Sequence, residues 1–548
     1  MNLMQNLPRD TQPAPDKDWW RGAVIYQIYP RSFLDSNGDG IGDLAGIIHG
    51  LDHVARLGVD AIWISPFFRS PMLDFGYDVT DYRDVDPMFG SLGDFDALVA
   101  RAHALGIKVL IDLVLSHTSN QHPWFQESQA SRDSSKADWY VWADARPDGT
   151  PPNNWLSIFG GSAWEWSGDR MQYYLHNFLR EQPDLNFHNP EVQDSVLNVA
   201  RFWLERGVDG FRLDTINFYF HDRQLRDNPA LAVDLRNATI APEVNPYNWQ
   251  NHLHDKNQPE NVAFLERLRA LMDEFPATTL VGEVGDAQYG SRIQAEYTAG
   301  DHRVHMCYSF DLLSGQQPTA EFFGRVLTRH EEGIGDGWAC WAFSNHDVMR
   351  HASRWALSDE GRALFATILL SLHGSACLYQ GEELGLTEAY VPFEELQDPY
   401  GIRFWPKFKG RDGCRTPIAW TSDYPHGGFS SGKPWLPMAA EHLSRAVAVQ
   451  DGDETSLLEF YRRMLAFRRA RPVLAKGSLT LVRASDGVLA YVREQQGTRM
   501  LCAFNLTDDP QPFDLPPGDW LADPLAPYAA TPGAPLPPLT ALFATQSA

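Results

Sequence analysis

The chain has 548 residues, of which 43% are hydrophobic and 21% are charged, as in folded globular proteins and unlike disordered ones. At roughly 150 residues per domain, this length predicts three to four domains, or one large domain with smaller ones attached. Forty-six Lys and Arg against 71 Asp and Glu leave a net charge of −25. That sign excludes a protein that coats nucleic acid and disfavours one that binds polyphosphate or an acidic membrane.

The cysteines and the N-terminus bear on the cellular compartment. No CxxC motif or close cluster occurs among Cys307, Cys340, Cys377, Cys414 and Cys502, so neither a disulfide scaffold nor a zinc ribbon is expected. The first 20 residues lack a basic segment followed by an apolar one, and no run of 18 apolar residues occurs. We therefore expect a cytoplasmic protein.

Eight short apolar runs alternate along the chain with polar or Gly-containing loops and stretches of helical periodicity. The runs cover residues 24–28, 61–64, 109–113, 210–213, 279–281, 308–310, 340–343 and 376–379. Helical periodicity is clear over 95–105 and 262–271. This order predicts an α/β fold in which eight parallel strands close as a (β/α)8 barrel. An open doubly wound sheet is the alternative, but no GxGxxG follows the first run.

Two long intervals and the C-terminal tail depart from this alternation. Residues 117–186, rich in Trp, Asn and Pro, are too long for a loop and predict a subdomain inserted after the third strand. The barrel would therefore comprise residues 1–116 and 187–474, with a Gly-, Pro- and Asp-rich insertion near 385–438. A helix near 457–471 would close it. Residues 475–548 alternate as short antiparallel strands and predict a C-terminal all-β domain.

Chemically reactive side chains follow several of the predicted strands. Asp214 ends the fourth, Glu283 follows the fifth and Asp347 follows the seventh. Catalytic residues of a barrel lie at the carboxyl ends of its strands, so these three carboxylates should meet at one rim, with His117 and Arg212 beside them. A metal cluster is conceivable, but an Arg among the carboxylates favours a sugar site with a nucleophile, a proton donor and an orienting acid.

Four segments in this order resemble the signature regions of glycoside hydrolase family 13. They are Asp112-Leu-Val-Leu-Ser-His117, Gly210-Phe-Arg-Leu-Asp214, Val281-Gly-Glu283 and Ser344-Asn-His-Asp347. Within that family the chain is most similar to the exo-acting α-glucosidase and oligo-1,6-glucosidase group. Supporting segments are Gln182-Pro-Asp-Leu-Asn186, Tyr379-Gln-Gly-Glu-Glu383 and Gly410-Arg-Asp-Gly-Cys-Arg-Thr-Pro417. The resemblance is close from residue 19 to about residue 470.

The resemblance implies catalytic roles. Asp214 would be the nucleophile, Glu283 the acid and base, and Asp347 the residue that binds the distorted glucose. The activity implied is that of a retaining exo-α-glucosidase that releases α-glucose from short α-glucosides by double displacement, with transfer of glucose to acceptors as a second outcome.

The resemblance also implies a set of substrate-binding residues. Arg212 would keep Asp214 ionised, and His117 and His346 would bond sugar hydroxyls. Asp74, Tyr77 and Arg415 match the family's clamp on the non-reducing glucose, in which a carboxylate–Arg pair takes hydroxyls and a ring stacks on the sugar. Phe159, Phe178 and Gln182 of the inserted subdomain would complete the pocket.

Thr215, directly after the nucleophile, should face the leaving sugar. In the resembling enzymes this position goes with the choice between α-1,4 and α-1,6 bonds, and Val is typical of the α-1,6 group. The Thr hydroxyl needs a hydrogen-bond partner when buried, and a sugar hydroxyl near the bond could supply it. We therefore expect a preference for α-1,4-linked disaccharides.

A Gly-rich loop after the first strand is a candidate metal site. Asp35, Asn37, Asp39, Ile41 and Asp43 place oxygen atoms at alternate positions, as in an EF-hand loop, with Ile41 contributing its backbone carbonyl. This predicts one structural Ca²⁺ or Mg²⁺, with a plain solvated turn as the alternative; no organic cofactor is expected. Many α-amylases bind calcium through an Asn where this chain has Ser116, so that second site is not expected here.

Rival functions exist within the family and outside it. Within the family these are an oligo-1,6-glucosidase, a trehalose-6-phosphate hydrolase, a sucrose isomerase and a transferase. The acidic net charge disfavours the phosphate pocket that a trehalose-6-phosphate hydrolase needs. The segment Gly324-Arg-Val-Leu-Thr-Arg-His does not reproduce the Arg-rich loop of the sucrose isomerases. A non-catalytic transporter heavy chain is a remote alternative, because such chains carry a transmembrane helix and lose catalytic carboxylates. Expected partners are short α-glucosides and sugar or alcohol acceptors, without nucleic acid or membrane, for a monomer or weak homodimer.

Overall fold

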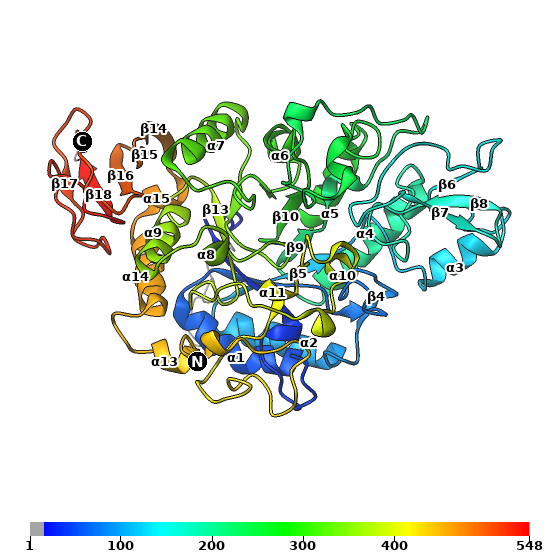
Figure 1. The fold of residues 1–548 in the computed structure, drawn as a ribbon, viewed down its shortest axis with the longest axis horizontal. Helices are drawn as coiled ribbons and strands as arrows, with labels where there is room; N and C mark the ends of the chain where they lie inside the picture. The colour runs from blue at the N-terminus through cyan, green and yellow to red at the C-terminus, as the bar shows by residue number, and fades with distance from the viewer. Residues whose placement is uncertain (1–15, 547–548) are drawn as a thin grey trace, which may run out of the picture.

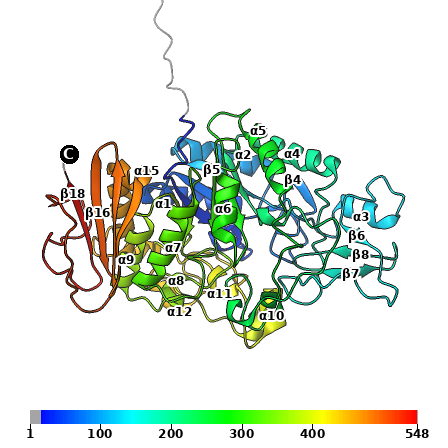
Figure 2. The same ribbon diagram turned by 90° about the horizontal axis from the view of Figure 1, so that it is seen from above.

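The computed structural model describes residues 16–546, and its centre is a sheet of eight parallel strands. The strands are β1 (Val24–Ile28), β2 (Ala61–Ile64), β5 (Lys108–Leu113), β9 (Gly210–Leu213), β10 (Thr279–Val284), β11 (Met306–Ser309), β12 (Cys340–Ala342) and β13 (Ser375–Tyr379). Their order is β11-β10-β9-β5-β2-β1-β13-β12, and a parallel bridge from Cys307 to Ala339 links the two edges. The sheet is a nearly closed barrel (Figures 1 and 2), which confirms the predicted fold class.

Apolar side chains fill both faces of the barrel wall, as the continuous hydrophobic runs of a parallel sheet require. Alternate residues of successive strands, such as Ile25, Trp63, Leu110 and Val281, form one buried cluster in the barrel interior. The residues between them, such as Tyr26, Ile62 and Val109, pack outward with the helices in a second and larger cluster.

Helices cover the outside of the barrel. The longer ones are α1 (Leu44–Leu57), α2 (Leu92–Ala104), α4 (Pro190–Glu205), α5 (Asn261–Met272), α6 (Gly290–Thr298), α7 (Ala320–Gly333), α9 (Asp359–Leu369) and α14 (Leu457–Ala470). Their ends follow from the sequence. Ser91 and Asp94 form a capping box, so α2 begins at Leu92, before residue 95, where the helical periodicity predicted its start. Likewise, Asn189 caps α4, and Pro190 takes its first position, where no backbone N–H is needed.

Several predicted strand boundaries were wrong, and β5 and β13 each begin one residue earlier than expected. Strand β11 begins at Met306 opposite Val281 of β10 and ends at Ser309, so Phe310 lies outside the ladder. Strand β12 ends at Ala342. Strand β10 continues to Val284, and this places Glu283 inside the strand. Apolar residues beyond a strand end continue the hydrophobic pattern without the ladder hydrogen bonds, which is why the pattern misplaces such ends.

Smaller elements lie at the two ends of the barrel domain. The segment after β5 holds α3 (Pro123–Ala130) and a sheet of β6 (Trp142–Ala143), β8 (Gln172–Leu175) and β7 (Trp164–Ser167), seen at the right of Figure 1. At the left of Figure 1, an antiparallel sheet contains β14 (Ser478–Ser485), β15 (Val488–Gln495), β16 (Thr498–Asn505), β18 (Ala541–Gln546) and β17 (Leu521–Ala522).

Short elements complete the chain. Strands β3 (Phe68–Arg69) and β4 (Asp81–Val85) pair with each other, and single helical turns η2 (Ile216–Phe218), η3 (Val233–Leu235) and η4 (Pro246–Trp249) interrupt the long segment between β9 and α5. The remaining ones are η1 (Pro30–Ser32), α8 (His351–Arg354), η5 (Phe393–Glu395), α10 (Pro399–Phe404), α11 (Asp412–Arg415), α12 (Ala440–Leu443), α13 (Val447–Gln450) and α15 (Pro472–Lys476).

Two sequence observations concern termini and cysteines. The expectation that no signal segment is present rests mostly on residues 1–15, which lie outside the described residues. A search of residues 16–546 finds no helix long and apolar enough to cross a membrane. All five cysteines are buried as free thiols.

Candidate active site

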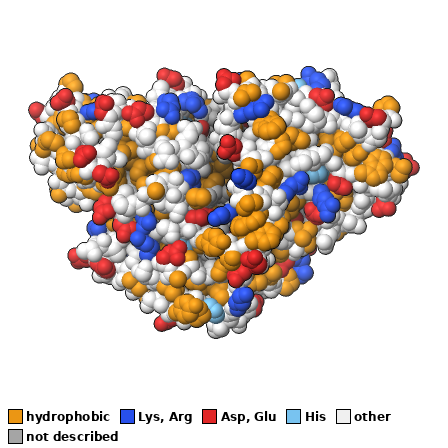
Figure 3. Space-filling model, in the orientation of Figure 1, with side chains coloured by type: hydrophobic (Ala, Val, Ile, Leu, Met, Phe, Trp, Pro, Cys, Tyr) orange, Lys and Arg blue, Asp and Glu red, His pale blue; other side chains and the backbone are white. Residues whose placement is uncertain are grey.

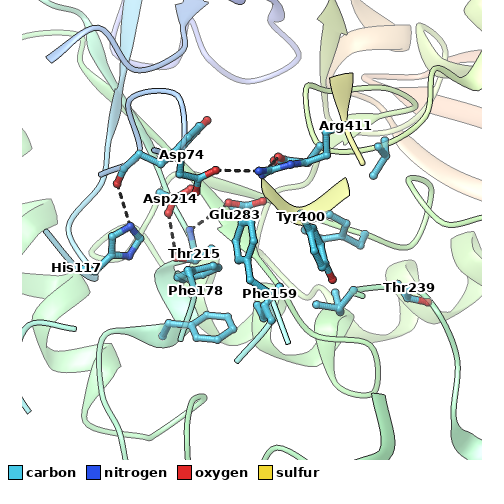
Figure 4. A pocket seen from close by; sticks show the side chains of 18 residues that line it. Asp74, His117, Phe159, Phe178, Asp214, Thr215, Thr239, Glu283, Tyr400 and Arg411 are labelled. Atoms are coloured by element: carbon cyan, nitrogen blue, oxygen red, sulfur yellow. Dashed lines mark hydrogen bonds and ion pairs between the residues drawn. The ribbon is translucent and has the colours of Figure 1, made fainter. Parts of the chain in front are cut away.

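A pocket opens at the carboxyl ends of the barrel strands, with a volume of about 790 Å³ including its mouth. Asp214, Glu283 and Asp347 reach it from the segments at the ends of β9, β10 and β12. The inserted segment adds Phe159 and Phe178. Figure 4 shows Asp74, Asp214, Glu283 and Arg411 along one side of the pocket, with Phe159, Phe178 and Tyr400 on the other. One side of the cavity is therefore charged and the other aromatic.

Arg212 holds two of the carboxylates together. It lies at the third position of β9, its side chain 1% exposed, and its guanidinium packs over the ring of Trp63. Its Nη1 donates to Asp214 Oδ1 at 2.7 Å, and its Nη2 donates to Glu283 Oε2. Because one planar group binds both acids, the two carboxyl groups lie next to each other on the pocket floor.

Further contacts keep Arg212 charged and fixed. Asp112, on the neighbouring β5, accepts from its Nη1 at 2.8 Å, and the hydroxyl of Tyr308 accepts from its Nη2 at 2.7 Å. Burial acts to lower the pKa of Arg212, but Asp112 and Glu283 outweigh it and hold this pKa well above its usual value. Arg212 itself does not line the cavity; it lies beneath the acids that do.

The surroundings of Glu283 favour its protonated form, which suits a proton donor. Burial raises the pKa of its carboxyl to about 8, Arg212 opposes this rise, and the charges of Asp214 and Asp347 add to it. Oε2 accepts from Arg212 and from the Thr215 backbone N–H at 3.1 Å. Among the described residues none bonds to Oε1, so this oxygen is free to carry the proton. A protonated carboxylic acid next to a nucleophilic carboxylate is the arrangement that acid-assisted glycoside cleavage requires.

Thr215 joins the two catalytic acids through an unusual backbone. Its φ of 38° and ψ of 54° are left-handed values that β-branched residues rarely adopt, at a cost of about 1–3 kcal/mol. In this conformation its N–H reaches Glu283, while its Oγ1 donates to Asp214 Oδ2 at 3.2 Å and contacts Ser116 Oγ at 3.3 Å. The hydroxyl therefore already has partners inside the protein and does not depend on a sugar hydroxyl for one.

Gly282 makes room for the segment that follows Thr215. A Cβ at this position would lie 2.4 Å from Ile216 Cδ1 and 2.8 Å from Cys307 Sγ. A larger residue would have to displace the Ile216 side chain, which folds back over β10. The hydrogen bonds of Asn217 to Gly285 fix this crossing. The long segment between β9 and α5 is thereby directed over the pocket, to which it contributes Phe218, Thr239 and Ile240.

The clamp at the closed end of the pocket corrects the sequence analysis. Arg411, and not Arg415, pairs with Asp74: Nη2 donates to Asp74 Oδ1 at 2.8 Å, and Nη1 donates to Asp347 Oδ1 at 3.2 Å. Arg411 directly precedes the single helical turn α11, and Arg415 is its last residue. The turn directs Arg415 beneath the pocket, where its Nε donates to the His346 carbonyl at 2.7 Å. The expected motif held both residues, and spacing alone could not tell which one faces the sugar.

The pKa values of Asp74 and Asp347 are shifted in opposite directions. Burial raises the pKa of Asp74 to about 6, although Arg411 opposes it. Burial also acts to raise the pKa of Asp347, but His346, Arg411 and Arg415 outweigh it and hold this pKa below its usual range. Asp347 is therefore a stable anion that can accept bonds from sugar hydroxyls.

Three residues expected to touch the sugar lie behind the pocket wall. His346 is fully buried, with its Nδ1 against Gln27 at 2.7 Å and its Nε2 against the hydroxyl of Tyr77 at 2.6 Å. Gln182 is also fully buried and donates to Asp74 Oδ2 at 3.1 Å. With Arg415 they lie behind the residues that line the cavity and support them, so their direct contacts with sugar stay a prediction.

Apart from Arg212, the other predicted catalytic and substrate-binding residues reach the cavity. They are Asp74, Tyr77, His117, Phe159, Phe178, Asp214, Thr215, Glu283 and Asp347. Sequence reasoning missed several lining residues, namely Ile158, Phe218, Thr239, Ile240, Gly285, Phe310, Val348, Tyr400 and Arg411. Most belong to loops without a recognisable motif. Arg411 lay in one of the segments that carry the family resemblance, and Phe310 lay in a predicted strand.

The predicted metal loop is described in full, and its carboxylates bind the loop's own donors. Asp35 accepts from the N–H groups of Asn37, Gly38 and Gly40 and from the hydroxyl of Ser430. Asp43 caps α1 through the Gly46 N–H. Within residues 16–546, no three His, Cys, Asp or Glu gather in a group that could hold a metal ion. The divalent ion stays a prediction.

Comparisons with known proteins agree with this geometry. Residues 27–477 match the model of the α-amylase catalytic domain. The chain is 63% identical over 506 residues to a probable α-glucosidase of Rhizobium meliloti (strain 1021), covering 92% of each chain. It is 36% identical to an oligo-1,6-glucosidase of Heyndrickxia coagulans, covering 92% of this chain and 95% of that one. A solved α-glucosyl transfer enzyme is similar with a TM-score of 0.94 at 56% identity, covering 97% of this chain and 100% of that one.

Proposed function

Because this chain belongs to the α-amylase family, glycoside hydrolase family 13, we propose that it is a retaining exo-α-glucosidase that releases α-glucose from the non-reducing end of short α-glucosides. One observation carries the proposal: the guanidinium of Arg212 holds Asp214 and Glu283 side by side at the floor of the pocket. A nucleophile and an acid about 5–5.5 Å apart leave no room for a water between them and favour double displacement.

In the first step Asp214 attacks C1 of the bound glucose. The bond from C1 to the glycosidic oxygen breaks, and that oxygen takes the proton of Glu283, so a covalent β-glucosyl ester forms and the aglycone leaves. In the second step the Glu283 carboxylate takes a proton from water or from an acceptor alcohol. The oxygen of that molecule bonds to C1, the ester bond to Asp214 breaks, and the product has the α configuration. Asp347 and the Asp74–Arg411 pair would hold the glucose hydroxyls.

Exo action follows from the closed end of the pocket. Asp74 and Arg411 are paired there at 2.8 Å, Arg411 packs over the ring of Phe159, and that ring lies 4.7 Å from the ring of Tyr400. A glucan chain that continued past this end would have to break these contacts, which favours the entry of a terminal glucose. We expect maltose and other disaccharides to be cleaved far faster per molecule than interior bonds of starch.

A panel of substrates tests this function. The purified protein is incubated separately with maltose, isomaltose, sucrose, trehalose-6-phosphate and starch, and products are followed by chromatography. Glucose as the first product from maltose, with no early fall in starch chain length, supports the proposal. Oligosaccharides released from starch interiors, or cleavage of trehalose-6-phosphate alone, would overturn it.

We propose that α-1,4 bonds are preferred, and Thr215 is the residue to test. Its hydroxyl supports Asp214, so Thr215→Val should lower kcat/KM on both maltose and isomaltose by about ten- to a hundredfold, the effect of losing a hydrogen bond to a charged group. If the position also selects the linkage, maltose should lose more than isomaltose. Equal losses would assign Thr215 to the support of Asp214 alone, and faster wild-type cleavage of isomaltose would favour the alternative, an oligo-1,6-glucosidase.

We also propose that the loop from Asp35 to Asp43 binds one structural Ca²⁺ or Mg²⁺. Its oxygen atoms come from alternate positions, and none of these residues lines the pocket. Removing divalent ions with a chelator should therefore lower the thermal unfolding midpoint and leave kcat on maltose unchanged, with Asp39→Ala abolishing the response to added Ca²⁺. An unfolding midpoint that ignores both chelator and Ca²⁺ would mean that the loop is a plain turn.

A further inference from the structure

The long segment between β9 and α5 returns to the barrel beside the strand that carries Glu283. Glu283 is the fifth residue of β10, and the strand ends at Val284. The next residue, Gly285, lines the catalytic pocket. Because only one residue separates Gly285 from Glu283, any displacement of the Gly285 backbone is passed along the strand to the acid.

The returning segment holds both polar groups of the Gly285 backbone. The Gly285 N–H donates to Asn217 Oδ1 at 3.0 Å, and the Gly285 carbonyl accepts from Asn217 Nδ2 at 3.2 Å and from Lys256 Nζ at 2.7 Å. Asn257 closes the contact, because its N–H donates to the Asn217 carbonyl and its side-chain amide donates to Asp286 Oδ2 at 2.7 Å. These five residues, Asn217, Lys256, Asn257, Gly285 and Asp286, form what we call the β10 clasp.

Lys256 contributes a buried ammonium group to the β10 clasp. Figure 3 shows Lys and Arg side chains spread over the face of the molecule, where their charges meet water, whereas Lys256 is 1% exposed. Its Nζ lies 3.5 Å from Asp286 Oδ2 and 4.9 Å from the centre of the Phe218 ring, which lines the pocket. Burial acts to raise the pKa of Asp286, but Lys256 and hydrogen bonds to the carboxylate outweigh it, so Asp286 remains an anion beside Lys256.

Stability alone does not account for an ammonium group in this place. A buried ion pair loses about as much free energy of hydration as it recovers by attraction, so an apolar side chain of similar size would often serve the fold as well. What the ammonium adds is a directed hydrogen bond that is stronger than one from a neutral donor. That bond ends at the peptide that follows β10, where a fixed position matters, because a displacement of about 1 Å at a reacting group can reduce a rate about a hundredfold.

We propose that Lys256 is a positioning residue for the general acid: by binding the Gly285 carbonyl, it holds the end of β10 so that Oε1 of Glu283 faces the glycosidic oxygen. The inference rests on the proposed retaining function. Lys256 does not line the catalytic pocket, so it acts through Glu283 and not on the sugar. Its contribution must therefore depend on how much the departing group needs the proton of Glu283.

Two donors with different leaving groups test the proposal. Lys256→Met nearly keeps the shape of the side chain and removes the hydrogen bond to Gly285. On maltose, whose departing oxygen needs a proton, kcat/KM should fall by about ten- to a hundredfold. On α-glucosyl fluoride, whose fluoride leaves without a proton, kcat/KM should fall by less than about threefold. A merely structural defect would lower both values alike, and a thermal melt of the same preparation shows whether the variant is folded.

A second variant reaches the same peptide from another residue. Asn217→Ala removes the other side chain that binds Gly285, and it should likewise lose more activity on maltose than on α-glucosyl fluoride. If Lys256→Met does not fold, this variant decides the question by the same comparison.

Lys136→Met is the matched control. Lys136 also places its Nζ over an aromatic ring, at 4.1 Å from the centre of Trp139, and near a carboxylate, at 3.7 Å from Glu127. It lies in the inserted segment, and it does not line the pocket. Its substitution should leave kcat/KM on both donors unchanged.

The other outcomes overturn the positioning role. Equal losses on the two donors would mean that the β10 clasp supports the pocket as a whole, and unchanged activity on maltose would mean that Glu283 keeps its place without Lys256. In both cases the wild-type protein still cleaves maltose, and the proposed α-glucosidase function stands. If the wild type cleaves neither maltose nor α-glucosyl fluoride, the proposed function fails and the positioning role fails with it.

Discussion

Replacing Asp214 by Asn is expected to lower kcat/KM on maltose by on the order of 10⁴-fold or more, because a neutral amide cannot form the glucosyl ester. The substitution is nearly isosteric, and Arg212 keeps its bonds to Asp112 and Glu283, so the thermal unfolding midpoint should change little. Initial rates and a thermal melt measured on the same preparation check both statements. Asp52→Asn removes a carboxylate that is 63% exposed and paired with Arg101 on the outer helices, and it should retain full activity.

A smaller variant separates a nucleophile from a residue that merely orients the sugar. Asp214→Gly leaves space for azide, which should attack C1 of an α-glucosyl fluoride from the vacated side and give β-glucosyl azide. If azide restores no turnover, or if Asp214→Asn keeps more than about a tenth of the wild-type kcat/KM, Asp214 is not the nucleophile.

Glu283→Gln should show a loss that depends on the leaving group. On maltose, where the departing oxygen needs a proton, kcat/KM should fall by about 10²–10⁴-fold, the range of general acid catalysis. On α-glucosyl fluoride the loss should be far smaller, because fluoride leaves without a proton. Equal losses on both donors would show that Glu283 positions the sugar and does not donate the proton.

The pH profile gives a second readout for Glu283. Burial raises the pKa of its carboxyl to about 8, and the protonated form is the active acid. Activity should therefore be present below this value and be lost as the pH rises through about 8 in kcat/KM on maltose, which reports the free enzyme. In Glu283→Gln with α-glucosyl fluoride this alkaline limb should be absent. An unchanged limb in the variant would assign it to another group.

Regular patterns in the sequence are enough to predict the barrel and the position of its site. Continuous apolar runs are the signature of a buried parallel strand, and the eight runs correspond to the eight strands of the barrel. The rule that barrel sites lie at strand ends correctly places Asp214, Glu283 and Asp347 together at one rim. The same rule predicts that His117 and Arg212 lie near them. His117 lines the cavity, and Arg212 lies directly beneath the acids.

What could not be predicted depends on contacts between distant segments. Arg411 and Arg415 have the same chemistry four positions apart, and only the turn of α11 decides which one meets Asp74, 337 positions earlier in the chain. The left-handed backbone of Thr215 is equally invisible in a sequence, because β-branched residues rarely adopt it. The sequence therefore offered a sugar hydroxyl as the hydrogen-bond partner of the Thr215 hydroxyl, whereas this hydroxyl already donates to Asp214.

The anomeric form of the first glucose released tests the central claim most directly. Maltose is hydrolysed in deuterated buffer, and the anomeric protons are followed by NMR from the first seconds, before mutarotation equilibrates them. Two displacements, at Asp214 and then by water activated at Glu283, predict that α-glucose appears first and that β-glucose grows in only at the rate of mutarotation. Initial release of β-glucose would mean a single displacement by water, and would contradict both the roles of the two carboxylates and the closely paired geometry from which they were inferred.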